Sequence, residues 1–367
     1  MPSISETRAT EAETLIKRHG ALGRIRLNRP KVLNSLTLQM VRDIEAALDD
    51  FERDAAIAAV LVTGEGERGL CAGGDIRAIY DGGKAGSDVP TTFWREEYTL
   101  NARIDRYPKP YIVVMDGIVM GGGVGISVYG SHRIVTERTR FAMPETGIGF
   151  FPDVGASWFL TRQAGELGTY VGLTGEPLGA ADAILCGLAD VFVPSGRLPE
   201  LIEALASLPS DSPREAVSAT IAGLSEAPPA GVLEPQQRVI DRLFAFDTIE
   251  GMLSALRADG SPFSERLLSV LTTKSPLSLN VTLRLLRLGR KTDRLEDCLE
   301  REFAATAAVL RSHDFYEGVR AAVIDKDRNP QWRPARLADV TAANVDAYFQ
   351  PSAQPLFADK IREGSPA

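Results

Sequence analysis

Residues 111–123 read YIVVMDGIVMGGG, and this stretch decides the fold that the sequence predicts. Residues 111–115 are all apolar, which predicts a strand that is buried on both faces. Glycines 121–123 follow after a short turn, and a helical pattern comes next. Three consecutive glycines cost conformational entropy on folding, but they let a ligand lie directly against the backbone. The unpaired N–H groups at the start of the following helix suit a developing oxyanion.

A second glycine turn lies earlier in the chain. Residues 71–76 read CAGGDI, and they too follow a predicted strand and precede a helical pattern. Two backbone N–H groups from separate turns are what an oxyanion hole requires. By spacing alone, an equally open alternative is a pair of tight strand-to-helix turns that bind nothing.

Two carboxylates stand downstream of the glycine turns. Glu145 and Asp153 are the only charged residues between 141 and 160. A carboxylate with apolar neighbours tends to have a raised pKa and can serve as an acid or a base. Asp153 precedes a helical pattern, so a role as that helix's N-cap is an open alternative. Glu145 follows a proline in a loop and has no evident capping role. The sequence therefore places the candidate chemistry of an enzyme between the triple glycine and these two carboxylates.

The segments before the glycine turns predict alternating strands and helices. Ile25 and Leu27 alternate with polar neighbours, as in a half-buried strand. Thr37 is placed to N-cap a helix, and residues 56–63 predict a second buried strand. The predicted helix has apolar residues at helical spacing, namely Met40, Val41, Ile44, Ala47, Leu48 and Phe51.

Further strand signals extend to about residue 194, and the pattern then becomes helical. Residues 133–136 and 140–143 predict a hairpin, and continuous apolar strands up to this point fit a buried sheet covered by helices. We therefore predict an α/β core over residues 15–194. Prolines punctuate helical segments from there on, so residues 195–350 predict a mostly helical region and residues 351–367 a loose tail.

Composition excludes several classes of protein. The chain has 367 residues, of which 44% are hydrophobic and 25% charged, as in ordinary globular proteins. Lys and Arg total 41 against 49 Asp and Glu, which gives a net charge of −8. Because no basic block appears, we expect no nucleic-acid partner.

The cysteines and the apolar stretches bear on localisation. Cys71, Cys186 and Cys298 are far apart and form no CxxC pair, which argues against disulfides and against a zinc site. A reducing, cytoplasmic compartment is the simplest expectation. The first twenty residues have no apolar run and do not resemble a signal or transit peptide. Residues 111–129 are interrupted by an aspartate and five glycines, so we expect no membrane span.

Together, the two glycine turns resemble the signature loops of the crotonase (enoyl-CoA hydratase/isomerase) superfamily. The resemblance implies that superfamily's α/β fold, a spiral of ββα units, here with a mostly helical C-terminal region. It implies an acyl-CoA substrate whose thioester oxygen accepts one backbone N–H from each loop. Carried over residue by residue, the donors are Gly74 and Gly122, and the neighbouring Gly73 and Gly121 belong to the substrate site.

The same resemblance assigns the remaining site residues. Glu145 matches the main catalytic carboxylate. Asp153 and Glu97 line the acyl pocket, with Asp153 near a substrate hydroxyl, and Asp75 and Ile76 contact the substrate. The similarity covers about residues 15 to 348, including FWREEY at residues 93–98, HDFYEGVR at residues 313–320 and IDKD at residues 324–327.

One absence separates the branches of the superfamily. Hydratases of this superfamily add water with two glutamates, and the first of these is replaced here by Gly125. Asp153 stands where hydratases carry a small residue. The resemblance therefore favours hydrolysis of a short 3-hydroxyacyl-CoA thioester such as 3-hydroxyisobutyryl-CoA, a step of valine catabolism. The alternatives are an enoyl-CoA hydratase or isomerase, and an acyl-CoA-binding protein without turnover.

This resemblance implies no cofactor and no metal, because coenzyme A is part of the substrate. The expected partner is the small-molecule acyl-CoA, and a homo-oligomer is possible because members of the superfamily often form trimers and hexamers. Arg29 and Lys31 near the first turn are candidates to meet the CoA phosphates, but a solvated turn explains their charge equally well.

Overall fold

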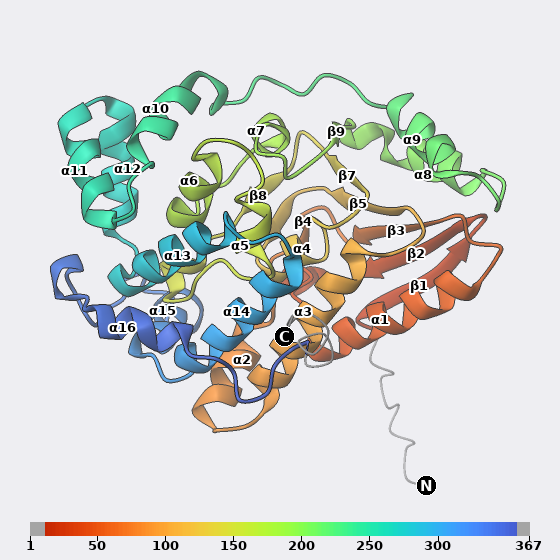
Figure 1. Cartoon of the computed structure of the whole chain (residues 1–367). Coiled ribbons are helices and arrows are strands. Elements are labelled where there is room, and N and C mark those ends of the chain that lie inside the picture. Colours follow the sequence, from red (N-terminus) through yellow and green to blue (C-terminus); the bar gives the residue numbers. More distant parts are fainter. Residues whose placement is uncertain (1–11, 358–367) are drawn as a thin grey trace, which may run out of the picture.

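The computed structural model describes residues 12–357, and its strands form two β-sheets between residues 14 and 192 (Figure 1). In the larger sheet the strand order is β1-β2-β3-β5-β7-β9. Its strands are β1 (Thr14–His19), β2 (Leu22–Leu27), β3 (Ala59–Gly64), β5 (Tyr111–Met115), β7 (His132–Val135) and β9 (Val191–Phe192). The smaller sheet consists of β4 (Gly69–Cys71), β6 (Ile118–Met120) and β8 (Arg140–Ala142). Among the described strands, β1 and β2 pair antiparallel, and every other neighbouring pair is parallel.

The chain forms the two sheets by repeating a ββα unit. From β3 to β8, the first strand of each unit lies in the larger sheet and the second in the smaller sheet, and a helix follows. The helices that follow β4, β6 and β8 are α2 (Ile76–Lys84), α4 (Gly122–Gly125) and the 3-10 helix η2 (Glu145–Ile148). This arrangement confirms the predicted crotonase-like α/β class. Because the three strands of the smaller sheet are parallel, the segments after them meet at one edge.

Local sequence accounts for the first helix as predicted. Thr37 caps α1 (Leu38–Arg53), since its side chain accepts a hydrogen bond from the Met40 N–H. All six apolar residues named for this helix are buried. The strand predicted over residues 56–63 forms as β3, which begins at Ala59. β5 has the bounds of the predicted strand.

The hairpin predicted for residues 133–136 and 140–143 is wrong. β7 pairs with β5 and β9 in the larger sheet, whereas β8 pairs with β6 in the smaller sheet. The turn between them, where Thr139 N–H bonds to the Thr136 carbonyl, has the length of a hairpin turn. Each strand instead finds a parallel partner in a different sheet, which local spacing does not reveal.

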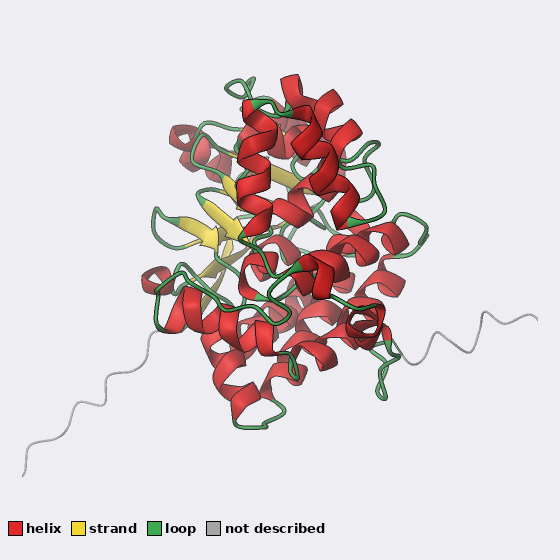
Figure 2. Cartoon of the chain, turned by 90° about the vertical axis from the view of Figure 1, so that its left-hand side faces the viewer, coloured by secondary structure: helices red, strands yellow, loops and turns green. Residues whose placement is uncertain are grey.

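Helices cover the sheets and make up the later chain (Figure 2). The long helix α3 (Val89–Asp105) packs against α1, α2 and α14. The remaining helices are α5 (Ala156–Phe159), α6 (Leu167–Thr174), α7 (Ala180–Leu185), α8 (Leu198–Ala206), α9 (Arg214–Ala222), α10 (Gln237–Leu243), α11 (Ile249–Asp259), α12 (Pro262–Thr272), α13 (Pro276–Gly289), α14 (Leu295–Val309), α15 (His313–Val319) and α16 (Ala342–Asp346).

One hydrophobic core joins the sheets to the late helices. Val113 of β5, Tyr98 of α3 and Phe303 of α14 belong to the same buried cluster. The late helices therefore pack against the same core as the sheets. The boundaries predicted at residues 194 and 350 remain predictions.

The described chain begins just before strand β1, and the described part of the predicted tail contacts helices α3 and α14. β1 begins at Thr14, and the stretch before residue 12 lies outside the described residues. In the predicted tail, Arg95 donates to the carbonyls of Gln354 and Pro355, and Glu300 accepts from the Leu356 N–H. Residues 358–367 lie outside the described part. Between residues 12 and 357, no helix has the length and apolarity needed to cross a bilayer.

Candidate active site

A cavity of about 120 Å³ lies where the loops after β4, β6 and β8 meet helix α3. Of the residues that the sequence assigned to the site, eight line this cavity: Gly73, Gly74, Ile76, Glu97, Gly121, Gly122, Glu145 and Asp153. Its remaining walls are largely apolar and include Ile79, Phe93, Trp94, Ile148 and Phe150. Residues from four separate segments thus converge on one small cavity.

The backbone N–H groups of Gly74 and Gly122 lie close together, and among the described residues neither donates a hydrogen bond. Gly122 is the first residue of α4, and the first N–H groups of a helix have no acceptor within it. Gly74 forms a bridge to Leu36, but the bridge uses the Gly73 carbonyl and the Asp75 N–H. A Cβ placed on Gly122 would lie 3.3 Å from the Gly74 nitrogen. The pair can therefore bind one oxygen from two sides.

Glycine is required where the second loop turns into the cavity. Gly121 has φ of 48° and ψ of −122°, a conformation that side chains disfavour. A Cβ on Gly122 would come within 2.2 Å of Oε1 of Glu97. A side chain at either position would distort the loop or fill the site.

Glu145 opens the 3-10 helix η2 and is 6% exposed. Burial raises the pKa of Glu145 well above that of an ordinary glutamate, and the charge of Asp153 adds to the rise. Lys274, in the loop between α12 and α13, acts in the opposite direction. In the described structure, Oε2 of Glu145 is buried without a hydrogen-bond partner. A carboxylate in this state is a strong base with free lone pairs.

Asp153 lies in the loop between η2 and α5 and is 5% exposed. Its Oδ2 accepts a 2.6 Å hydrogen bond from the Tyr98 hydroxyl. Burial raises the pKa of Asp153 to about 7, against the lowering effect of this bond. The suggestion that Asp153 caps the following helix is wrong. Gly155 is the N-cap of α5, and Val154 and Gly155 turn the chain before the helix begins.

Glu97 and Glu96 have opposite environments on helix α3. Glu97 is 2% exposed and lines the cavity, whereas Glu96 pairs with Arg42 at the surface. Burial, and then the charge of Asp153, raise the pKa of Glu97 well above its ordinary value. Its Oε1 finds no hydrogen-bond partner among the described residues. The assignment of Glu97 rather than Glu96 to the site therefore agrees with its position.

Three carboxyl groups of raised pKa thus share one small cavity. Burial raises the pKa of each group, and the charge of Asp153 adds to the rise for Glu97 and Glu145, so ionisation of one carboxyl opposes ionisation of the others. Two N–H donors for an oxyanion stand beside them. This combination suits acid–base chemistry on a carbonyl compound.

Position 125 has no room for a carboxylate. A Cβ on Gly125 would lie 2.8 Å from both the Asn101 amide nitrogen and the Val154 Cβ. Asn101 is fully buried on α3, and both of its amide atoms are without partners in the part of the chain described. The space beside Gly125 is therefore filled by Asn101 and Val154.

Asp75 and Arg29 are occupied elsewhere. Asp75 is the N-cap of α2, accepting from the Ala78 N–H, and its other oxygen accepts from Arg29 at 3.0 Å. Arg29 also pairs with Glu13. Asp75 does not line the cavity, so its position supports a structural role rather than the predicted substrate contact.

Sequence reasoning missed several residues of the site. The segment at residues 93–98 was noted only through the resemblance, and Tyr98 was not singled out. Asn101 follows Glu97 by one helical turn, and this spacing was the available signal. Among the described residues, no group of three or more His, Cys, Asp or Glu side chains is arranged to hold a metal ion.

Comparisons with known proteins agree on the family. Residues 22–349 match the family model described as Enoyl-CoA hydratase/isomerase. The chain is 44% identical over 348 residues to a mitochondrial 3-hydroxyisobutyryl-CoA hydrolase of Rattus norvegicus, covering 92% of this chain and 89% of that protein. It is 43% identical over 345 residues to the corresponding protein of Gallus gallus, with coverage of 93% and 89%.

A solved structure resembles the whole fold. It is described as a carnitinyl-CoA dehydratase from Mycobacterium thermoresistibile, with a TM-score of 0.89 and 45% identity. The alignment covers 94% of this chain and 98% of the other. The late helices are therefore shared with this relative as well.

The names of the rat and chicken relatives contradict the cytoplasmic localisation expected from the sequence, because both are mitochondrial proteins. The expectation rested on unpaired cysteines. All three are buried thiols, and burial alone explains why they form no bridges. Unpaired thiols therefore do not identify the cytoplasm.

Proposed function

The chain belongs to the enoyl-CoA hydratase/isomerase family, and from this premise we propose that it hydrolyses short 3-hydroxyacyl-CoA thioesters, 3-hydroxyisobutyryl-CoA first among them. The observation that carries the proposal is that Glu145 and Asp153 line one cavity while position 125 carries a glycine. A hydratase needs a second glutamate at position 125, and Asn101 and Val154 fill that space. Asp153 supplies a carboxylate on another side of the same cavity.

The thioester oxygen accepts the N–H groups of Gly74 and Gly122 in the proposed complex. These bonds strengthen as the carbonyl becomes tetrahedral and negatively charged, when one such donor is worth roughly 2.7–4 kcal/mol. The amides are fixed by the loops before binding, so they need no reorganisation during the reaction.

Glu145 is the proposed base. In one route its carboxylate takes a proton from water, hydroxide adds to the thioester carbon, and the C–S bond breaks. The proton then passes to the departing CoA thiolate, giving a carboxylic acid and a thiol. In the other route Glu145 attacks the carbonyl carbon, and the C–S bond breaks as the CoA thiolate leaves. Water then hydrolyses the mixed anhydride to the product acid and protonated Glu145, whose proton passes to the thiolate. Single-turnover hydrolysis in ¹⁸O-water separates the routes, because only the anhydride route leaves label in Glu145.

Asp153 is proposed to recognise the 3-hydroxyl. Tyr98 occupies its Oδ2, so its other oxygen is the one available to a ligand in the cavity. With a pKa of about 7, Asp153 can also accept and return a proton near neutral pH. Glu97 completes the polar side of the acyl pocket. The apolar walls and the small volume favour a short acyl group.

A thiol-release assay tests this function. The protein is incubated separately with 3-hydroxyisobutyryl-CoA and with crotonyl-CoA. We expect free thiol from the first ester and no hydration of the second. Hydration of crotonyl-CoA without thiol release would establish the hydratase alternative. Binding of both esters with neither reaction would establish the acyl-CoA-binding alternative.

Two finer expectations stay predictions within this proposal. Acting on 3-hydroxyisobutyryl-CoA would place the enzyme in valine catabolism. The expected homo-oligomer is checked by size-exclusion chromatography with light scattering, with a mass above 39.6 kDa supporting it.

A further inference from the structure

The turn that follows Asp153 has a backbone conformation that side chains rarely adopt. Val154 has φ of 53° and Gly155 has φ of 82°. Valine is branched at Cβ, so the left-handed region crowds its side chain against the backbone. Such a backbone persists only where its surroundings hold it in place. The position of Asp153 therefore depends on the groups that hold this turn.

Glu302 of helix α14 holds the turn from the side of the late helices. Its Oε2 accepts the Gly155 N–H at 2.6 Å. Its Oε1 accepts the Ser157 N–H at 2.9 Å and the Ser157 hydroxyl at 2.5 Å. These three bonds take the place of the side-chain N-cap that Asp153 does not provide. Glu302 thus bonds the N-cap residue of α5 and the second residue of that helix.

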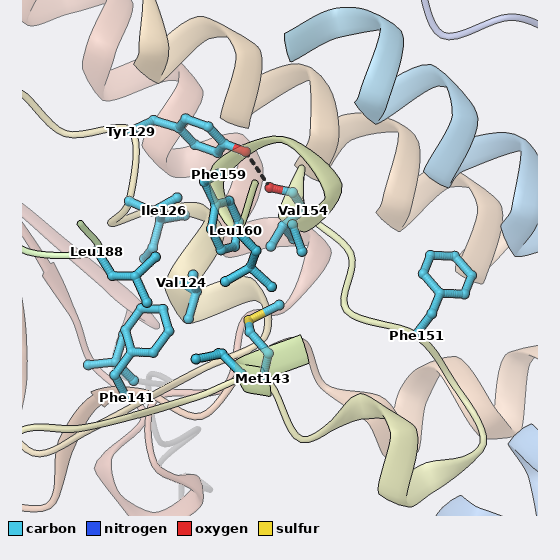
Figure 3. Packing of buried hydrophobic residues seen from close by; sticks show 14 of the residues in the cluster. Val124, Ile126, Tyr129, Phe141, Met143, Phe151, Val154, Phe159, Leu160 and Leu188 are labelled. Atoms are coloured by element: carbon cyan, nitrogen blue, oxygen red, sulfur yellow. Dashed lines mark hydrogen bonds between the residues drawn. The ribbon is translucent and has the colours of Figure 1, made fainter. Parts of the chain in front are cut away.

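Tyr129 gives the turn a second support. The Tyr129 hydroxyl donates a 2.7 Å hydrogen bond to the Val154 carbonyl, and Figure 3 shows this hydroxyl pointing at the turn. Tyr129 and Phe159 pack edge to face beside it. The turn is therefore held by one carboxylate and one phenol, which belong to different parts of the chain.

Stability alone gives little reason to place a glutamate at position 302. The side chain is 0% exposed, and its helical neighbours Leu299 and Phe303 are also buried. Burial raises the pKa of Glu302 to about 8, and the charge of Asp153 adds to the rise. A buried carboxylate is often no more stabilising than an apolar side chain of similar volume. What the carboxylate provides is geometry, because a single side chain accepts three bonds from the turn.

We propose that Glu302 is a positioning residue that holds Asp153 at the 3-hydroxyl of the substrate, so that the late helices determine hydroxyl recognition. The inference rests on the proposed function, in which Asp153 reads that hydroxyl. Glu302 bonds the turn but does not line the cavity itself. Its effect on the reaction passes through the backbone from residue 153 to residue 157.

The substitution Glu302→Gln tests the proposal with little change in volume. The amide can accept at one oxygen only, and its NH₂ group then faces an N–H donor of the turn. The readout is the preference for 3-hydroxyisobutyryl-CoA over isobutyryl-CoA, the same ester without the 3-hydroxyl, as a ratio of kcat/KM values. We expect the ratio to fall roughly 10- to 100-fold, the scale expected when a functional group moves by about 1 Å.

Two further variants separate positioning from general damage. Tyr129→Phe removes the second hydrogen bond to the turn and should lower the same ratio of kcat/KM values. If Glu302→Gln does not fold, this variant provides the test of whether the turn positions Asp153. Glu166→Gln is the matched control, because Glu166 is a buried carboxylate held by Arg287 and Arg290, and its hydrogen bonds do not involve residues 153–157. It should lower the melting temperature and leave the ratio unchanged.

Binding measurements separate this inference from the proposed function, because the preference for the hydroxylated ester can be measured without turnover. Dissociation constants for the two esters are compared in Glu145→Gln and in Glu145→Gln/Glu302→Gln. Absence of thiol release by the wild type would refute the hydrolase and leave this binding ratio readable. A hydroxyl preference that is equal in folded proteins with and without Glu302 would overturn the positioning role.

Discussion

The Tyr98 hydroxyl donates a 2.6 Å hydrogen bond to Oδ2 of Asp153, and both groups are buried. The bond joins helix α3 to the loop before α5, and it lowers the pKa that burial raises. It therefore has two effects: it orients one carboxylate oxygen and it favours the ionised form. Each effect can be measured.

Tyr98→Phe should raise the pKa of Asp153 further. A hydrogen bond to a charged group is worth about 1.5–3 kcal/mol, and each pKa unit corresponds to about 1.4 kcal/mol, so we expect a rise of about one to two units. The acid limb of the kcat/KM profile should move to higher pH by that amount. Tyr107→Phe is the control, because that buried hydroxyl bonds to the Leu48 carbonyl instead. An unmoved acid limb in Tyr98→Phe would show that Asp153 ionisation does not limit the reaction.

The buried carboxyl of Glu97 should make stability fall as pH rises. Its pKa is higher in the folded chain than in the unfolded chain, so the folded protein binds the additional proton. The associated stability is fully present below about pH 4.5 and is lost as the pH rises through the folded-state value. Glu97→Gln should therefore raise the melting temperature more at pH 8 than at pH 4.5, while activity falls.

Glu96→Gln is the matched control for this measurement. Glu96 is the neighbouring residue on α3, but it lies at the surface and pairs with Arg42. Its replacement should give no gain in melting temperature at pH 8. Equal melting-temperature changes for the two variants would contradict the claim that burial of Glu97 costs stability.

A glutamate placed at position 125, where hydratases of the superfamily carry one, should not produce hydratase activity. In Gly125→Glu the new side chain meets Asn101 and Val154, whose atoms already lie within 2.8 Å of a Cβ at that position. Overpacking of this kind costs about 1–3 kcal/mol or more. We expect a lower melting temperature and no hydration of crotonyl-CoA. A stable variant that hydrates crotonyl-CoA would show that position 125 alone separates the two activities.

The acyl pocket should accept longer chains when its wall is cut back. Ile148 lines the cavity and is only partly buried, so Ile148→Ala enlarges the pocket at a moderate cost in stability. Its kcat/KM should rise for longer 3-hydroxyacyl-CoA esters relative to 3-hydroxyisobutyryl-CoA. Ile44→Ala in the core of α1 is the control, which should lose stability without changing that preference. An unchanged preference in Ile148→Ala would place the end of the acyl chain elsewhere.

Local patterns were enough to predict those parts of the fold that depend on near neighbours. The helix capped by Thr37 and the strand over residues 111–115 follow from spacing and burial within a few residues. The two glycine turns and Glu145 could be placed together only through the resemblance. No spacing rule says that segments so far apart in sequence share one cavity.

What could not be predicted depends on long-range contacts. The hairpin at residues 133–143 was wrong because each strand pairs with a parallel partner from a distant segment. The capping role of Asp153 was wrong because Glu302, on a late helix, supplies the bonds instead. One signal for Glu302 was present, since it lies on the apolar face of α14 with Leu299 and Phe303. A charge on such a face indicates a buried partner, but it does not say which one.

The most direct test of the account is the rate of thiol release from 3-hydroxyisobutyryl-CoA by Glu145→Gln. The substitution keeps the shape of the side chain and removes the base, whose loss typically costs about 10²- to 10⁴-fold. We predict a fall in kcat of that size, with the dissociation constant of the ester close to that of the wild type and the melting temperature at pH 8 no lower. A folded Glu145→Gln that binds the ester and releases thiol at the wild-type rate would contradict the catalytic role of Glu145.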